Sequence, residues 1–136
     1  MKSNVQEVLW THALKAYENA HAPYSNFKVG AALIDEQGHI FSGCNIENSS
    51  YGATLCAERA ALAAMVTAGG QACIEMVVVS NTPEGCPPCG LCRQVLSEFS
   101  NNNHAQLKIH VSNIKGVLKT YTLSDLLPHA FNKTYL

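Results

Sequence analysis

The sequence predicts an α/β fold in which helices cover both faces of a mixed five-stranded sheet, giving three layers. Segments with helical and with strand-like character alternate along the chain in the order α-β-β-α-β-α-β-β-α. Residues 74–79 form a continuous apolar run, which is typical of a strand buried on both faces. The length of 136 residues suits a single domain, residues 1–136, with one core.

The N-terminal part predicts a helix followed by a hairpin. Residues 3–6 match a capping box that begins at Ser3, and Pro23 is expected to stop the helix. Its apolar side is formed by Val5, Leu9, Ala13, Ala16, Tyr17 and Ala20. Residues 27–34 and 39–44 are then expected to form two strands, joined by a turn in which Gly38 supplies a positive φ.

The remaining elements follow a polar loop at residues 45–54. An alanine-rich helix is expected over residues 56–68, ended by a glycine pair at 69–70. After the buried strand, a turn-rich loop at 83–88 leads to a third helix from Cys89 to about Phe99. Strands are expected at 107–111 and 118–122, and Ser124 is expected to cap a short last helix.

Composition favours a small ligand over a polynucleotide or a membrane. The net charge is −1 and the basic residues are scattered, whereas a nucleic-acid-binding surface requires a clustered basic face. Residues 1–10 contain no apolar segment of a secretory signal, and no apolar run approaches the length that spans a membrane. We therefore expect a reducing cytoplasm, in which the six cysteines are free or bound to metal.

Three cysteines and one glutamate form the most informative pattern in the chain. Cys56-Ala57-Glu58 is followed by Pro88-Cys89-Gly90-Leu91-Cys92. A catalytic zinc commonly takes three protein ligands and leaves the fourth position to water, whereas a structural zinc is usually closed by four ligands. The pattern matches the zinc-deaminase signature, in which the glutamate carries protons and is not a ligand. Cys56, Cys89 and Cys92 are the predicted zinc ligands.

Five blocks of the sequence, in order, resemble the small homotetrameric cytidine deaminases. They are residues 23–33, 43–48, 56–59, 88–95 and 126–131. The resemblance implies the three-layer αβα cytidine deaminase-like fold, one zinc per subunit and hydrolytic deamination of cytidine and deoxycytidine in pyrimidine salvage. It also implies a homotetramer in which neighbouring subunits complete each active site.

Two residues beside Cys56 are assigned roles from helix geometry. Residues at i and i+2 do not share a helix face, so Glu58 suits a proton shuttle on the pocket wall better than a ligand. Arg59 follows Cys56 by three residues, on the same face, and its guanidinium can reach the thiolates. We expect Arg59 to offset the negative charge of three thiolates, together with the positive ends of two helices.

The substrate-binding residues are assigned mainly by the resemblance. Phe27 can stack on a flat ring but equally suits a core position, and Asn45 and Glu47 can either hold a ribose or cap the end of a loop. The family implies that Asn45 and Glu47 bind the sugar 3′-hydroxyl, Phe27 flanks the base and the Ala57 backbone reads the pyrimidine edge. Matching residues from neighbouring subunits are Tyr51 and Phe131.

Other interpretations remain open at this point. A closed four-cysteine structural zinc that uses Cys86 would make the chain a non-catalytic module. Deaminases of cytosine-containing antibiotics such as blasticidin S share the cysteine motif, although residues 45–48 keep the sugar-binding motif. The chain also departs from the family pattern, because Pro87 replaces a common serine, Cys86 is an added thiol and the tail after Phe131 is short.

Overall fold

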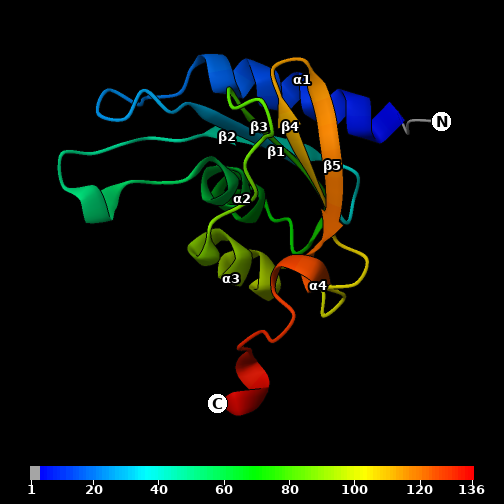
Figure 1. Cartoon of the computed structure of the whole chain (residues 1–136). Helices are drawn as coiled ribbons and strands as arrows, with labels where there is room; N and C mark the ends of the chain where they lie inside the picture. Colours follow the sequence, from blue (N-terminus) through cyan, green and yellow to red (C-terminus); the bar gives the residue numbers. More distant parts are fainter. Residues whose placement is uncertain (1–3) are drawn as a thin grey trace.

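The computed structural model describes residues 4–136, which form a mixed sheet with helices on both faces (Figure 1). The helices are α1 (Asn4–Glu18), α2 (Ala57–Thr67), α3 (Gly90–Glu98) and α4 (Leu123–Leu126), with two 3₁₀ turns, η1 (Tyr51–Ala53) and η2 (Lys133–Tyr135). The strands are β1 (Val29–Asp35), β2 (Ile40–Cys44), β3 (Cys73–Ser80), β4 (Lys108–Asn113) and β5 (Gly116–Thr122). The predicted fold class and order of elements are confirmed.

The sheet has the strand order β2-β1-β3-β4-β5. Strand β1 is antiparallel to both β2 and β3, β3 is parallel to β4, and β4 is antiparallel to β5. The parallel pair requires a crossover, and α3 lies within it (Figure 1). This crossover brings the start of α3 near the start of α2.

Alternate residues of the central strands pack against the helices on opposite faces of the sheet, because successive side chains of a strand point to opposite faces. On one face Leu9 and Ala13 of α1 pack with side chains of β1 and β3, namely Ala32, Val77 and Val79. On the other face α2, α3 and α4 pack with Ala31, Leu33, Met76, Val78 and Ile109. The run predicted to be buried is buried from Met76 onward, whereas Ile74, at the beginning of β3, is 45% exposed.

A close contact between β2 and α2 fixes where α2 starts. A Cβ atom at Gly43 would lie 2.6 Å from the Ala61 nitrogen and 2.9 Å from the Ala57 carbonyl oxygen. These distances are too short for any side chain, so only glycine lets the first turns of α2 lie against this strand. Cys56 is the N-cap of α2, and Cys89 is the N-cap of α3.

Two predicted boundaries were wrong, and one prediction falls on residues that are not described. Helix α1 ends at Glu18, well before Pro23, and the chain continues into a bridge between His21 and Ile46. The cap of α4 is Thr122 and not Ser124, because β5 continues to Thr122 and the helix follows at once. Ser3, the predicted cap of α1, lies outside the described residues.

Candidate metal centre

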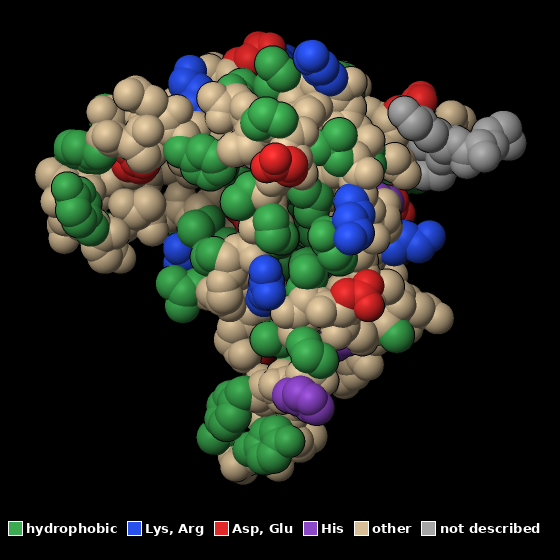
Figure 2. Space-filling model, in the orientation of Figure 1, with side chains coloured by type: hydrophobic (Ala, Val, Ile, Leu, Met, Phe, Trp, Pro, Cys, Tyr) green, Lys and Arg blue, Asp and Glu red, His purple; other side chains and the backbone are tan. Residues whose placement is uncertain are grey.

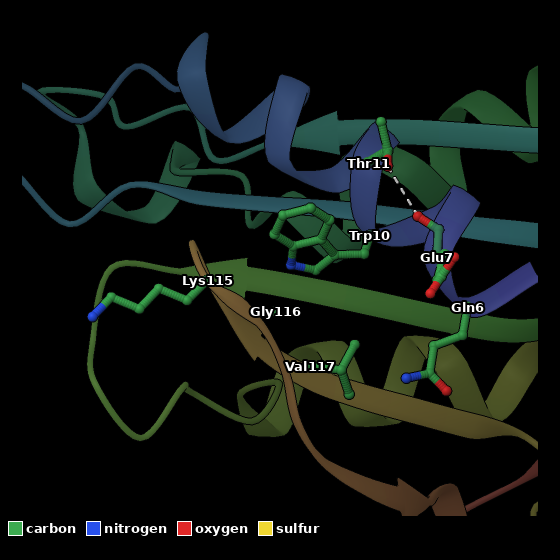
Figure 3. A pocket seen from close by; sticks show the side chains of 7 residues that line it. All are labelled: Gln6, Glu7, Trp10, Thr11, Lys115, Gly116 and Val117. Atoms are coloured by element: carbon green, nitrogen blue, oxygen red, sulfur yellow. Dashed lines mark hydrogen bonds between the residues drawn. The ribbon is translucent and has the colours of Figure 1, made fainter. Parts of the chain in front are cut away.

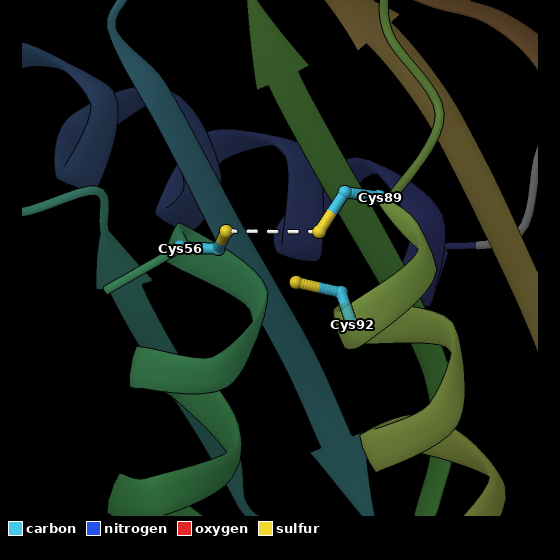
Figure 4. Close-up of side chains that lie close together, drawn as sticks. All are labelled: Cys56, Cys89 and Cys92. Carbon is cyan, nitrogen blue, oxygen red and sulfur yellow. Dashed lines mark hydrogen bonds between the residues drawn. The ribbon is translucent and has the colours of Figure 1, made fainter. Parts of the chain in front are cut away.

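The thiols of Cys56, Cys89 and Cys92 meet at the starts of α2 and α3. Their sulfur atoms all lie within 4.8 Å of one another (Figure 4), and the Sγ atoms of Cys56 and Cys89 are 3.8 Å apart. Two sulfurs bound to one tetrahedral zinc at the usual bond length are separated by about 3.8 Å. The donor set therefore fits zinc in both its chemistry and its spacing.

Cys86 is not a member of this thiol group among residues 4–136. Its thiol instead contacts the carbonyl oxygen of Pro87, at 3.6 Å. Burial raises the pKa of the Cys86 thiol, which disfavours the thiolate that a ligand must supply. The geometry thus favours a three-ligand site with an open fourth position over the closed four-cysteine alternative.

Cys56 and Cys92 each change the pKa of the other's thiol. A hydrogen bond from the Cys92 thiol, followed in importance by one from Arg59, lowers the pKa of Cys56 to about 5 against the opposing effect of burial. The same bond to Cys56 raises the pKa of Cys92. Cys56 is therefore a thiolate at neutral pH and attracts a cation, while Cys92 releases its proton as a metal binds.

Arg59 lies against Cys56, as the helical spacing predicts. Its Nη2 atom donates to the Cys56 Sγ at 3.5 Å and to the Thr54 carbonyl oxygen at 3.4 Å. The contact with the Cys56 sulfur raises the pKa of the guanidinium. The interaction places a permanent positive charge beside one of the three sulfurs.

Glu58 lies in the first turn of α2 and is only 5% exposed. Burial raises the pKa of its carboxyl to about 7, and the negative charge of Cys56 adds to this effect. A carboxyl group with this pKa can both accept and release a proton near neutral pH. Because Glu58 lines the same hollow as Cys56 and Cys89, it can exchange protons with a molecule bound there.

A hollow of about 160 Å³ adjoins the cysteines and is lined mainly by apolar side chains. Four residues predicted to bind or act on substrate line it: Phe27, Asn45, Ala57 and Glu58. Cys56 and Cys89 line it as well, and the rest of the wall was not predicted to bind substrate: Val29, Thr54, Val78, Cys86 and Pro87. A narrow apolar hollow with a few polar groups suits a flat heteroaromatic ring.

Asn45 and Glu47 occupy two adjacent hollows. The Asn45 amide is buried and holds the backbone at the rim of the first hollow, since it accepts from the Val29 nitrogen at 2.9 Å and donates to the Phe27 oxygen at 2.7 Å. Glu47 lines the neighbouring hollow, as Tyr51 does, and Thr54 lines both. The structure thus places the two predicted sugar-binding residues in two hollows that share Thr54, and not in one cavity.

The Glu47 carboxylate is held by the loop before β1. It accepts hydrogen bonds from the backbone nitrogens of Tyr24, at 2.9 Å, and Ser25, at 3.2 Å, and from the Ser25 hydroxyl. The hydroxyl bond is the main reason that the pKa of Glu47 is lowered. Glu47 therefore stays ionised at neutral pH and remains an acceptor.

The two aromatic residues predicted to act between subunits are exposed. Tyr51 is 77% exposed and meets Tyr24 edge to face, with ring centroids 6.1 Å apart. Phe131 is 57% exposed and stacks on Tyr135 at 5.7 Å. Neither lines the hollow at the cysteines of its own chain. Figure 2 shows hydrophobic side chains gathered on the C-terminal segment, which extends away from the sheet in Figure 1.

Another hollow, of about 250 Å³, lies between α1 and the β4–β5 hairpin (Figure 3). Trp10 forms one wall, and its indole Nε1 donates to the Asn113 carbonyl oxygen at 3.1 Å. Its lining contains Glu7 and Lys115 but none of the three grouped cysteines. None of the residues predicted to bind metal or substrate lines this hollow.

Residues 3–105 match the family model described as the cytidine and deoxycytidylate deaminase zinc-binding region. A cytidine deaminase of Sporosarcina psychrophila is 45% identical over 127 residues, which cover 93% of this chain and 91% of that protein. One from Mycobacterium tuberculosis is 39% identical over 120 residues, which cover 88% of this chain and 84% of that protein. The crystal structure of cytidine deaminase from Burkholderia pseudomallei superposes with a TM-score of 0.85 at 42% identity, covering 96% of this chain and all of that one.

Proposed function

Because this chain belongs to the cytidine and deoxycytidylate deaminases, we propose that it hydrolyses cytidine and deoxycytidine to uridine and deoxyuridine, releasing ammonia, as a zinc-dependent enzyme of pyrimidine salvage. The observation that carries the proposal is the group of three thiols with Glu58 buried in the same hollow. A structural metal site has no need of a buried carboxyl beside it.

The three cysteines would hold a metal that activates a water molecule. When held by Cys56, Cys89 and Cys92, zinc supplies a Lewis acid that lowers the pKa of a water in the open position. Three thiolates make this site more negative than one built from neutral imidazoles. Arg59 and the N-terminal ends of α2 and α3 return positive charge to it.

Glu58 moves the protons. It takes one proton from the attacking water, whose oxygen adds to C4 of the cytosine ring, and passes that proton to N3. It then takes the second proton, from the hydroxyl now on C4, and passes it to the amino group, which leaves as ammonia when the C4–N bond breaks. The raised pKa of Glu58, about 7, lets it change protonation state in both directions during one turnover. Its burial keeps bulk water from competing for these protons.

The walls of the hollow orient the nucleoside. Phe27 flanks the base, and the backbone N–H of Ala57, in the first turn of α2 and free of an intrahelical acceptor, binds the pyrimidine edge. Asn45 and Glu47 bind the sugar 3′-hydroxyl. Each of them already holds backbone atoms, but an amide and a carboxylate have further donor or acceptor capacity.

The active form is a homotetramer in which Tyr51 and Phe131 reach the hollow of a neighbouring subunit. The support is that both aromatic rings are largely exposed and lie outside the hollow of their own chain. We place the enzyme in the cytoplasm, where a reducing environment keeps the ligand thiols available for metal. No helix within residues 4–136 is long and apolar enough to cross a membrane.

To test this proposal, the protein is purified and its zinc content is measured. It is then incubated separately with cytidine, deoxycytidine, cytosine and blasticidin S. Ammonia release is measured for each, with a Cys92→Ser variant as the metal-free control. We expect turnover of both nucleosides and little with the free base. Turnover of blasticidin S alone would favour the antibiotic deaminase, and no turnover by zinc-loaded protein would overturn the assignment.

A further inference from the structure

Cys89 is the least enclosed of the three ligands. It is exposed, whereas Cys56 is half-buried and Cys92 is buried. The segment that leads to it, residues 81–88, is neither helix nor strand. Its last two residues, Pro87 and Pro88, have no N–H group and can be held only through their carbonyl groups.

The side chain of Arg93 supplies such a hold. Its Nε atom donates to the carbonyl oxygen of Pro88 at 2.7 Å, and its Nη1 atom donates to the carbonyl oxygen of Leu126 at 2.9 Å. The backbone nitrogen of Arg93 also donates to the oxygen of Cys89, at 3.0 Å. One residue of α3 thus binds both residues of the Pro88–Cys89 step and ties them to α4.

The anchor at Leu126 is itself fixed. Helix α4 is closed by a reciprocal capping box between Thr122 and Asp125. Its first residue, Leu123, is fully buried, and the Leu123 nitrogen donates to the Leu107 oxygen at 2.9 Å. The Arg93 guanidinium therefore connects Pro88, the residue before Cys89, to α4, which is packed into the core.

We propose that Arg93 is a positioning residue for the metal, which holds Cys89 in its ligand geometry by joining Pro88 to the end of α4. Retention of zinc then depends on a residue that is not itself a ligand. The role differs from that of Arg59, which contacts a sulfur directly. It rests on the zinc site but not on the deamination reaction.

Arginine is suited to this position and lysine is not. The planar guanidinium presents donors in a fixed fork, so that Nε and Nη1 can hold two carbonyl groups at once, whereas a lysine ammonium is a single point of donation. The neighbouring Gln94 offers a matched control, since its Nε2 atom donates to the Phe131 oxygen at 2.9 Å and holds the C-terminal tail. Both side chains come from the same turn of α3.

The experiment compares zinc release from the wild type and three variants, Arg93→Gln, Arg93→Lys and Gln94→Ala. Each protein is loaded with zinc, its metal content is confirmed, and release into an excess of a chromogenic chelator is followed over time. The thiolate-to-cobalt charge-transfer band of cobalt-loaded samples reports the ligand geometry. Melting of the metal-free proteins measures the general contribution to stability.

We expect Arg93→Gln to release zinc about 10- to 100-fold faster and to alter the cobalt band, with Arg93→Lys between it and the wild type, while Gln94→Ala stays within about twofold of the wild type. A wild-type release rate in Arg93→Gln overturns the proposal, and so does equal acceleration in Gln94→Ala. Should Arg93→Gln not fold, a wild-type rate in Arg93→Lys overturns it. Absence of deamination by zinc-loaded wild type would refute the proposed function and leave this comparison intact.

Discussion

The Nη2 atom of Arg59 lies 3.5 Å from the Sγ atom of Cys56, one helical turn earlier at the start of α2. The contact sets a cation against the thiol of Cys56, and after the hydrogen bond from Cys92 it is the next cause that lowers the pKa of this thiol to about 5. A site with three thiolates is otherwise rich in negative charge, which opposes loss of a proton from a nearby water. The Arg59–Cys56 pair is therefore expected to act on the pH dependence of the reaction.

Replacing Arg59 with Gln should keep zinc in place but shift the pH–rate profile. Removing the positive charge makes proton loss from the attacking water harder, so the kinetic pKa of the acidic limb of kcat/KM should rise by on the order of one unit. Activity is then lost at neutral pH and recovered at higher pH. Lys119→Gln, which removes a cation from over the Tyr121 ring, serves as the control. An unchanged profile in zinc-loaded Arg59→Gln would refute the role of Arg59.

Replacing Glu58 with Gln should abolish turnover without loss of metal. Glutamine keeps the shape of the side chain but cannot accept a proton, and loss of such proton transfer costs about 10²- to 10⁴-fold in rate. The measurement is kcat together with zinc content per chain. Glu98→Gln, at an exposed position at the end of α3, should match the wild type. Near-normal turnover by a zinc-loaded Glu58→Gln protein would end the assignment.

Replacing Cys86 with Ser should leave the zinc content intact, because the Cys86 thiol lies outside the group of three sulfurs. Cys92→Ser, in contrast, removes one of the grouped sulfurs and should lower zinc binding sharply. Metal analysis after dialysis distinguishes the two outcomes. A fall in zinc content in Cys86→Ser to the level of Cys92→Ser would restore the four-cysteine interpretation.

Replacing Phe131 with Ala should raise KM and leave kcat nearly unchanged. Loss of one aromatic stacking contact corresponds to about 0.5–1.5 kcal/mol, or about 2- to 12-fold in KM. Glu58 remains in place, so the proton transfers are unaffected. Steady-state kinetics with cytidine provide the measurement.

Mixing two defective chains tests whether Phe131 acts across a subunit boundary. Hybrids of Glu58→Gln and Phe131→Ala chains contain sites with Glu58 from one chain and Phe131 from the other. Activity with the wild-type KM should therefore appear on mixing and reassembly. If only the high-KM activity of Phe131→Ala is seen, the ring acts within its own chain.

The grouping of the three cysteines was predicted from the sequence because their placement depends on local structure. Cys56 and Cys89 each directly precede a helix that the sequence pattern predicts, and the spacing of Cys89 and Cys92 makes Cys89 the N-cap of α3 and places Cys92 in its first turn. The predicted contact between Arg59 and Cys56 follows from the same three-residue helical spacing. Regular periodicity was sufficient for all of these residues.

Contacts between distant segments could not be predicted in this way. The hydrogen bond from Arg93 to Leu126 joins residues 33 positions apart and depends on how α3 packs beside α4. Likewise, the position of Cys86 on the wall of the hollow depends on the path of an irregular loop. The cap at Thr122 was missed because this residue is both the last of β5, where the strand was predicted to end, and the N-cap of α4, in which its side chain accepts from the Asp125 nitrogen.

The ligands at Cys56 and Cys89 come from opposite sides of β3 in the sequence. During synthesis the ribosome exposes the first of them well before the second, and neither holds zinc alone in this geometry. Only a molecule that has inserted β3 and brought two helix starts to one end of the sheet offers the complete thiol set. The zinc content of newly made protein is therefore expected to measure the fraction of molecules in which this step of folding is complete.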